Sequence, residues 1–180
     1  MRVAIAGAGK VGRSIARELI ANGHQVQLID RDPSKAGALS STGEVLDVLI
    51  GDTCEISILD QANLSSCQVL VAATGDDKVN LVVSLLAKTE YGAPRVVARV
   101  NHPKNEWMFD EAWGVDVAVS TPRMLSALVE EAVTVGDLVR LFTFRQGNAN
   151  LVEITLDTNS QVIGQLVRSC QWPADTALVA

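Results

Sequence analysis

The sequence predicts an α/β fold in which one parallel sheet carries helices on both faces. The apolar run Val3–Ala6 suits a strand buried on both faces, and a glycine turn, a helix and a second strand follow it up to Asp30. Further strand-like runs begin about 20 to 26 residues apart, the spacing of repeated strand–helix–strand units. Right-handed crossovers then give a doubly wound sheet of six strands in the order 3-2-1-4-5-6.

The turn after the first strand carries three glycines at the spacing G-x-G-x-x-G. Gly7 permits the tight turn, Gly9 lets backbone N–H groups approach a pyrophosphate, and Gly12 lets the following helix pack closely on the sheet. Phosphates would then lie at the positive end of that helix. The turn therefore predicts a Rossmann nucleotide-binding site.

A helix and a second strand complete this unit. Val11, Ile15 and Leu19 share one face of the helix, and the next strand ends at Asp30, 18 residues beyond Gly12. An acid at this place accepts hydrogen bonds from the two ribose hydroxyls of an adenosine. The alternative is a Rossmann-like turn that has lost its ligand.

The remaining strands of the sheet are expected at Val45–Ile50, Val69–Thr74, Arg95–Val100 and Asp116–Ser120. Ligands of such sheets bind at the carboxyl ends of the strands, and polar residues follow several of these strands. They are Asp52 and Thr53 after the third strand, Thr74, Gly75, Asp76 and Asp77 after the fourth, and Arg99 in the fifth.

Two of these polar side chains suit a nucleotide, although one has a second explanation. Asp52 can accept from an adenine amino group, and Arg99 provides a cation for an anionic ligand. Asp52 and Asp76 are equally well explained as ordinary helix N-caps.

The composition argues against several classes of protein. The 180 residues suit one main domain with a small appendage, and 48% of them are hydrophobic. A net charge of −6 and a pI near 4.9, without a basic cluster, argue against nucleic-acid binding. No apolar run approaches the roughly 18 residues needed to span a bilayer, and no signal peptide precedes the first strand. We therefore expect no direct membrane insertion.

Cysteines and histidines are few. Cys54, Cys67 and Cys170 are an odd number at no metal-ligand spacing, which favours reduced thiols in a cytosolic protein. With His24 and His102 as the two histidines, a zinc site has few ligands to draw on, and none is predicted.

The polar residues in combination resemble a known family. The segments Gly7-Ala-Gly-Lys-Val-Gly12, Gly23-His24, Asp30-Arg-Asp32, Gly51-Asp52, Thr74-Gly-Asp-Asp77 with Asn80-Leu81, and Ala98-Arg99-Val100 are similar to those of the RCK (KTN) domain. This domain occurs in the TrkA-type regulatory subunits of potassium uptake systems. The resemblance implies a cytosolic homo-oligomer, a dimer and possibly a tetramer or octameric ring, that binds NAD(H) or ATP/ADP. It also implies that the oligomer gates a membrane potassium transporter or channel at the inner face of the cell membrane.

The resemblance also assigns site residues by position. Phosphates would contact the glycine turn, the ribose would contact the end of the second strand, and the later strand ends would complete the pocket. The residues concerned are Gly7, Ala8, Gly9, Lys10, Val11 and Gly12 for the phosphates, Asp30 and Arg31 for the ribose, and Asp52, Thr53, Cys54, Thr74, Gly75, Asp77 and Arg99 for the remainder. Asp30 should repel a 2′-phosphate, so NADP is disfavoured.

The sequence departs from the family pattern at three positions. A hydroxyl residue is commoner where Cys54 stands, which leaves a contact near the adenine open. Glu is commoner where Lys78 stands, and a second cation where Asn101 stands. Neither a metal near Asp77 nor a second phosphate clamp is therefore expected.

The chain is expected to divide into a nucleotide-binding domain over residues 1–136 and a partial C-terminal subdomain over residues 137–180. Strands at Leu138–Arg145 and Asn150–Asp157 would form a hairpin about Gly147-Asn148. A short helix at Val162–Val167 and a strand at Thr176–Ala180 would follow.

Two segments predict an interface with a second copy. Trp107, Phe109 and Trp113 crowd what is expected to be one short helix, and large aromatics are common interface anchors. The next helix, Arg123–Thr134, is apolar over an arc wider than one sheet-facing stripe needs. Packing against the C-terminal hairpin would explain that arc equally well.

Two further functions compete with a regulatory subunit. A nicotinamide-dependent oxidoreductase would need an acid for hydride transfer, and no His or Cys stands where one is expected. Arg95 follows Tyr91 by four residues, so a Tyr-x-x-x-Lys pair is missing as well. A ligandless structural Rossmann module is the third possibility. The sequence favours a binding protein over an enzyme.

Overall fold

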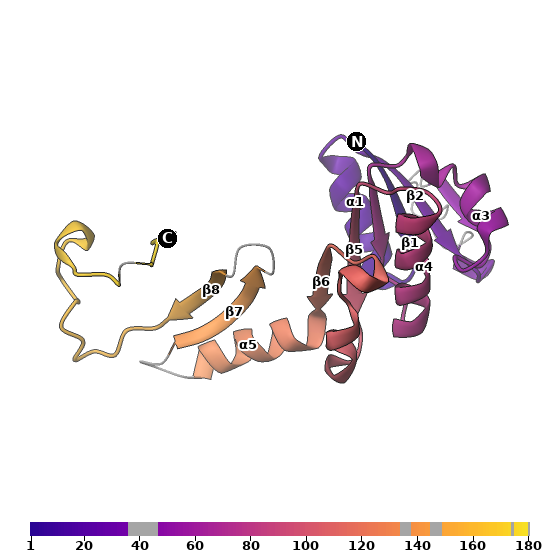
Figure 1. The fold of residues 1–180 in the computed structure, drawn as a ribbon. Coiled ribbons are helices and arrows are strands. Elements are labelled where there is room, and N and C mark those ends of the chain that lie inside the picture. Colours follow the sequence, from indigo (N-terminus) through magenta and orange to yellow (C-terminus); the bar gives the residue numbers. More distant parts are fainter. Residues whose placement is uncertain (36–46, 134–137, 145–148, 174, 180) are drawn as a thin grey trace. The chain divides into compact units, whose positions relative to one another are not determined.

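The structure, a computed structural model, describes residues 1–35, 47–133, 138–144, 149–173 and 175–179 (Figure 1). These residues form two compact units, Met1–Arg123 and Met124–Ala180. Helix α5 (Thr121–Val133) begins in the first unit and continues into the second. The division at residues 136 and 137 stays a prediction.

The first unit is built on a six-stranded parallel sheet. Its strand order is β3-β2-β1-β4-β5-β6, and every neighbouring pair is parallel. This confirms the predicted doubly wound fold. The strands are β1 (Arg2–Ala6), β2 (Gln25–Asp30), β3 (Asp47–Ile50), β4 (Val69–Ala72), β5 (Arg95–Val100) and β6 (Val117–Ser120). Residues 45 and 46 of the predicted third strand lie outside the described residues.

Alternating side chains of the strands give the sheet two separate cores. Val3 and Ile5 of β1 pack with Ala16 of α1 (Lys10–Ala21), together with Ile15 and Leu19 of the same helix. Ala4 and Ala6 belong to the other core, which α3 (Ile56–Gln61) and α4 (Asp77–Thr89) complete. A two-residue period in the strand with helices on both faces requires this separation.

The segment between β5 and β6 differs from the prediction. Trp107 lies on the 3-10 helix η2 (Pro103–Met108) and Trp113 on a second one, η3 (Glu111–Trp113), rather than on one helix. Phe109, between them, is fully buried in the core beside Val96 and Val115, whereas Trp107 is 76% exposed. Assigning Phe109 to an interface was therefore wrong, because it fills the interior of its own domain.

The second unit contains an antiparallel hairpin of β7 (Leu138–Phe144) and β8 (Ala149–Ile154). The predicted hairpin is confirmed, although its turn at Gly147-Asn148 lies outside the described residues. The predicted helix at 162–167 was wrong. Turns pass through Gly164 at a φ of +77°, where a helix cannot continue, and the 3-10 helix η4 covers Val167–Ser169.

The predicted strand at 176–180 was also wrong over the residues that are described. Residues 176–179 form no strand. Within the described part of the chain, no helix has the length and apolar character required to cross a bilayer.

Candidate nucleotide-binding site

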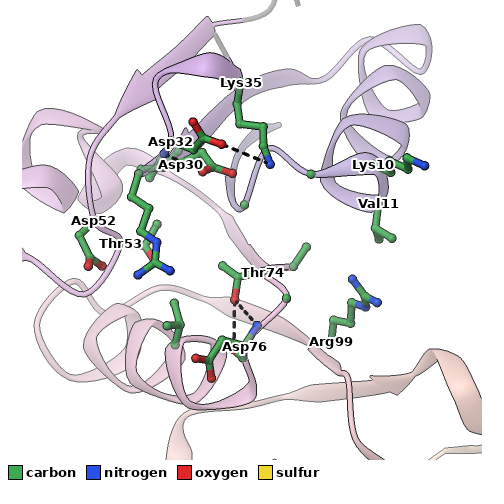
Figure 2. Close-up of a pocket in the computed structure, with 17 residues that line it drawn as sticks. Lys10, Val11, Asp30, Asp32, Lys35, Asp52, Thr53, Thr74, Asp76 and Arg99 are labelled. Carbon is green, nitrogen blue, oxygen red and sulfur yellow. Dashed lines mark hydrogen bonds and ion pairs between the residues drawn. The ribbon is translucent and has the colours of Figure 1, made fainter. Parts of the chain in front are cut away.

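A cavity of about 750 Å³ lies at the carboxyl ends of the parallel strands (Figure 2). This volume falls within the range typical of small-molecule sites. The residues that line it come from the ends of β1, β2, β4 and β5 and the segments that follow them, from the loop after β3, and from the first turns of α1 and α4. They are Gly7, Gly9, Lys10, Val11, Ile29, Asp30, Arg31, Asp32, Lys35, Asp52, Thr53, Ala73, Thr74, Gly75, Asp76, Val79 and Arg99.

The glycine turn presents the N-terminus of α1 to this cavity. Gly9 is the N-cap residue, and none of the described side chains caps the helix. A Cβ atom added to Gly9 would meet nothing within 4 Å, so the backbone there is open to a ligand. Uncapped N–H groups and the helix dipole together favour an anion at this place.

Gly7 and Gly12 have a different role from Gly9. Gly7 has a φ of +105°, and a Cβ atom there would lie 3.0 Å from the Ala73 carbonyl. A Cβ atom on Gly12 would overlap the Gly7 carbonyl oxygen. Both glycines therefore allow close packing of backbone within the turn, as the motif predicts.

Asp30 supports the turn as well as lining the cavity. Its Oδ2 accepts from the Ala8 N–H at 2.7 Å, and its Oδ1 accepts from the Asp32 N–H at 3.0 Å. Each carboxylate oxygen has a second lone pair, so Asp30 can still accept from ligand hydroxyls. The Ala8 N–H, in contrast, is already committed to the protein.

Charges of both signs line the cavity, and they are not evenly distributed. The cations are Lys10, Arg31, Lys35 and Arg99, and the acids are Asp30, Asp32, Asp52 and Asp76. Figure 2 shows Lys10, Val11 and Arg99 at one end and Asp52 and Thr53 at the other. Two of the four cations, Lys10 and Arg99, therefore lie at the end beside the glycine turn, which we call the cationic end.

Arg99 adds an unsatisfied donor to that cationic end. Its Nε is buried and has no hydrogen-bond partner among the residues that the structure describes. A buried guanidinium N–H without an acceptor is costly, and an anionic ligand would satisfy it. The role of Arg99 as a ligand for an anion stays a prediction.

The acids near the cavity are held by local hydrogen bonds. Asp76 caps α4, because its Oδ1 accepts from the Lys78 N–H at 2.9 Å. The Ser34 hydroxyl and N–H donate to Asp32 and hold the pKa of that carboxyl below its usual range. Asp52 does not cap a helix, since the N-cap residue of α3 is Glu55. It accepts from the Cys54 N–H at 2.9 Å.

The structure brings most of the predicted site residues together at the cavity and leaves four outside its lining. Ala8 is buried behind the turn, Gly12 lies against Gly7, and Cys54 is half-buried. Burial, and secondarily the nearby Asp52 carboxylate, raises the pKa of the Cys54 thiol.

Asp77, the fourth residue outside the lining, points into the protein. Its carboxylate accepts from the N–H groups of Asn101 and His102 and from the side chains of Asn101 and Asn105, at 2.6 to 3.0 Å. Asp76 rather than Asp77 therefore faces the cavity. The assignment of Asp77 to the pocket does not agree with this geometry.

Six residues that line the cavity were not among the assigned site residues, namely Ile29, Asp32, Lys35, Ala73, Asp76 and Val79, although Asp76 had been noted at a strand end. Ile29 and Ala73 adjoin predicted site residues, so strand-end position alone could have indicated them. Val79 stands three residues after Asp76, one helical turn into α4, and a helical period could have indicated it.

Comparison with known proteins identifies the family. The family model of the TrkA-N domain matches residues 3–121. The Trk system potassium uptake protein TrkA of Mycobacterium tuberculosis is 60% identical over 179 residues, which make up 99% of this chain and 80% of that protein.

Solved structures share the fold. A structure of the GsuK channel bound to NAD has a TM-score of 0.70 at 18% identity, over 78% of this chain and 25% of that one. A structure of GsuK bound to ADP has a TM-score of 0.61 at 27% identity, over 73% of this chain and 34% of that one. Since the family model covers well over half of its length and a relative covers nearly all of it, the chain belongs to the TrkA-N family.

Proposed function

We propose that this chain is a nucleotide-sensing regulatory subunit of a potassium uptake system. It binds NAD(H) or ATP/ADP in the cavity at the strand ends, and binding changes the geometry of a homo-oligomer. That oligomer attaches to a membrane potassium transporter or channel at the cytoplasmic face and controls its opening. The high identity to a Trk system protein supports the potassium system as the context.

The cationic end of the cavity is the observation that carries the nucleotide part of this proposal. The N-terminus of α1 and the buried Nε of Arg99, for which the described part of the chain provides neither a side-chain cap nor an acceptor, suit phosphates. Asp30 and Asp52, farther along the cavity, suit a ribose and an adenine amino group. The ADP-bound GsuK structure, at 27% identity, supports the same ligand class.

Such a ligand would regulate by thermodynamic linkage between nucleotide binding and the arrangement of the oligomer. A nucleotide must bind one arrangement of the oligomer more tightly than another, because equal affinity for both shifts nothing. Couplings of about 1–3 kcal/mol are the usual scale. Helix α5 suits the contact between copies, since Leu125, Leu128 and Val129 are about half exposed or more on it.

A binding protein also fits the chemistry of the cavity better than an enzyme does. Its lining contains no His, Cys or Tyr among the described residues, so a usual proton donor for carbonyl reduction is not at hand. Incubation with NADH and a range of carbonyl substrates should give no turnover above background. Sustained NADH oxidation that a cavity substitution abolishes would favour the oxidoreductase instead.

Thermal melts with NAD, NADH, NADP, ATP and ADP test the ligand class directly. A nucleotide at 100 times its dissociation constant adds about 2.7 kcal/mol of stability. For a chain of this size that raises the Tm by roughly 5 °C or more. The proposal is refuted if none of the five nucleotides raises the Tm at any concentration up to saturation of the assay.

A further inference from the structure

Asn80 joins the two strand ends that carry Thr74 and Arg99. It lies in α4, is fully buried, and does not itself line the cavity. Its Oδ1 accepts from the Thr74 N–H at 2.9 Å and from the Thr74 hydroxyl at 2.6 Å. Its Nδ2 donates to the Thr74 carbonyl at 3.3 Å and to the Arg99 carbonyl at 2.9 Å. All four hydrogen bonds of one side chain therefore go to two residues that line the cavity.

These partners determine the orientation of the Asn80 amide. The Thr74 N–H is a donor and must face Oδ1, whereas the two carbonyl oxygens are acceptors and must face Nδ2. A carboxylate or a hydroxyl could not supply two donors and two acceptors at once in this geometry. The single proton of the Thr74 hydroxyl is used within the protein, on Asn80 or on the Asp76 carbonyl, and the hydroxyl oxygen accepts from the Asp76 N–H at 3.3 Å. Thr74 can therefore offer a ligand one acceptor lone pair of its hydroxyl.

A second amide reinforces the same connection. Asn101 donates through Nδ2 to the Thr74 carbonyl at 3.0 Å and to the Asp77 carboxylate at 3.0 Å. Burial would raise the pKa of Asp77, but hydrogen bonds from Asn101, Asn105 and His102 hold it below its usual range. The carboxylate stays charged and anchors the residues after β5.

We propose that Asn80 is a positioning residue for the nucleotide. It holds the backbone of Arg99 against that of Thr74 and so determines where the guanidinium enters the cavity. A buried polar network in which every group is satisfied is rigid, and a rigid support preserves affinity because little order is lost on binding. This inference rests on the proposed function, since it concerns binding of the same ligand.

A double-mutant cycle on ADP binding tests the inference. Calorimetry would measure the dissociation constant for the wild type, Asn80→Ala, Arg99→Ala and the double variant, well below their melting temperatures. Each single change should weaken ADP by about tenfold or more, the effect of losing or misplacing a charge-assisted hydrogen bond. The two losses should multiply to clearly more than the loss in the double variant, because Asn80 acts through Arg99.

Asn105→Ala is the matched control. It removes an amide that donates to Asp77 at 2.8 Å in the same network, and among the described residues Asn105 shares no hydrogen bond with Thr74 or Arg99. ADP affinity should stay within about twofold of the wild type, since the variant loses only one hydrogen bond to the Asp77 carboxylate. If Asn80→Ala does not fold, Asn80→Asp serves instead, because it keeps the shape and the acceptor for the Thr74 N–H. It loses both donors and should weaken ADP in the same direction.

The outcomes separate the two proposals. A wild type that binds none of the nucleotides refutes the proposed function and this inference with it. A wild type that binds ADP, with either Asn80 variant binding equally well, overturns the inference alone. If the loss of ADP affinity in the double variant equals the product of the two single losses, the inference is overturned as well. Asn80 would then affect binding independently of Arg99, as a general loss of stability would.

Discussion

Alanine at Gly9 and alanine at Gly12 should have opposite consequences, although the two glycines are three residues apart in one motif. At Gly9 the φ is −70° and a new Cβ atom meets nothing within 4 Å. At Gly12 the new Cβ atom overlaps the Gly7 carbonyl oxygen and lies 3.1 Å from its carbon. Gly7 cannot retreat, since its N–H bonds to the Ile29 carbonyl at 2.7 Å and Ala73 confines its other side.

The expected magnitudes follow from these contacts. Overpacking against backbone at Gly12 costs about 1–3 kcal/mol, and the better helix propensity of alanine offsets up to about 1 kcal/mol. The net loss, about 1–2 kcal/mol at the middle of that range, lowers the Tm by roughly 2–8 °C. At Gly9, the entropy lost by the unfolded chain and the poorer N-cap nearly cancel, so stability should change by less than about 0.5 kcal/mol.

Alanine at Gly9, which should hardly change stability, should weaken ADP binding. Its new Cβ atom stands where the phosphates would approach the N-terminus of α1, so ADP should bind about tenfold more weakly or worse. Calorimetric titration with ADP and thermal melts of both variants measure the two effects separately. Gly9→Ala that binds ADP like the wild type would refute the placement of phosphates against the turn. Gly12→Ala with an unchanged Tm would refute the packing argument.

Three further predictions concern ligand choice, assembly and pH. Lys10→Ala should weaken the binding of ATP more than that of ADP, and that of NADH only mildly, because a point charge acts on phosphate charge. Asp30→Asn should reduce the preference for NAD over NADP. Calorimetry with these ligands measures both effects, and a wild type that binds NADP as tightly as NAD would remove Asp30 from the site. Replacing Leu128 and Val129 with Asp should convert dimers or larger rings to soluble monomers, since charge would be buried in the contact. Sedimentation measures this, and a monomeric wild type would reject α5 as the interface. Asp77→Asn should destabilise the protein at pH 7. Because the pKa of Asp77 in the folded state is lowered from 3.8, the stabilisation by its carboxylate is complete above about pH 3.8 and is lost as the pH falls through the lower folded value. Urea unfolding at several pH values should therefore show the difference in unfolding free energy between wild type and variant narrowing only below pH 3.8, and a difference that already narrows near pH 6 would contradict the assignment.

Much of the candidate site was predictable because its signals are local. The glycine spacing, the acid at the end of β2 and the polar residues at the strand ends are short patterns with a direct backbone meaning. The parallel arrangement then brings all the strand ends to one edge of the sheet. Eleven of the residues expected at the site line the cavity for this reason, from Gly7 to Arg99.

The residues that sequence reasoning misplaced depend on partners distant in the chain. Asp76 and Asp77 are adjacent acids after the same strand, and nothing local tells which of them faces the cavity. Asp77 turns inward because Asn101 and Asn105, 24 and 28 residues away, donate to its carboxylate. Asn80 likewise gains its meaning only from Arg99, 19 residues away.

The sequence by itself determined the sheet, its strand order and the position of the glycine turn. Periodicity and glycine spacing are properties of neighbouring residues, and right-handed crossovers leave few topologies open. Only the tertiary structure decided that Phe109 is buried while Trp107 is exposed, and that Asp77 anchors the loop after β5 instead of lining the site. Both outcomes depend on which distant segments reach the same place, and a side chain's burial and hydrogen bonds are determined by those neighbours rather than by its own type.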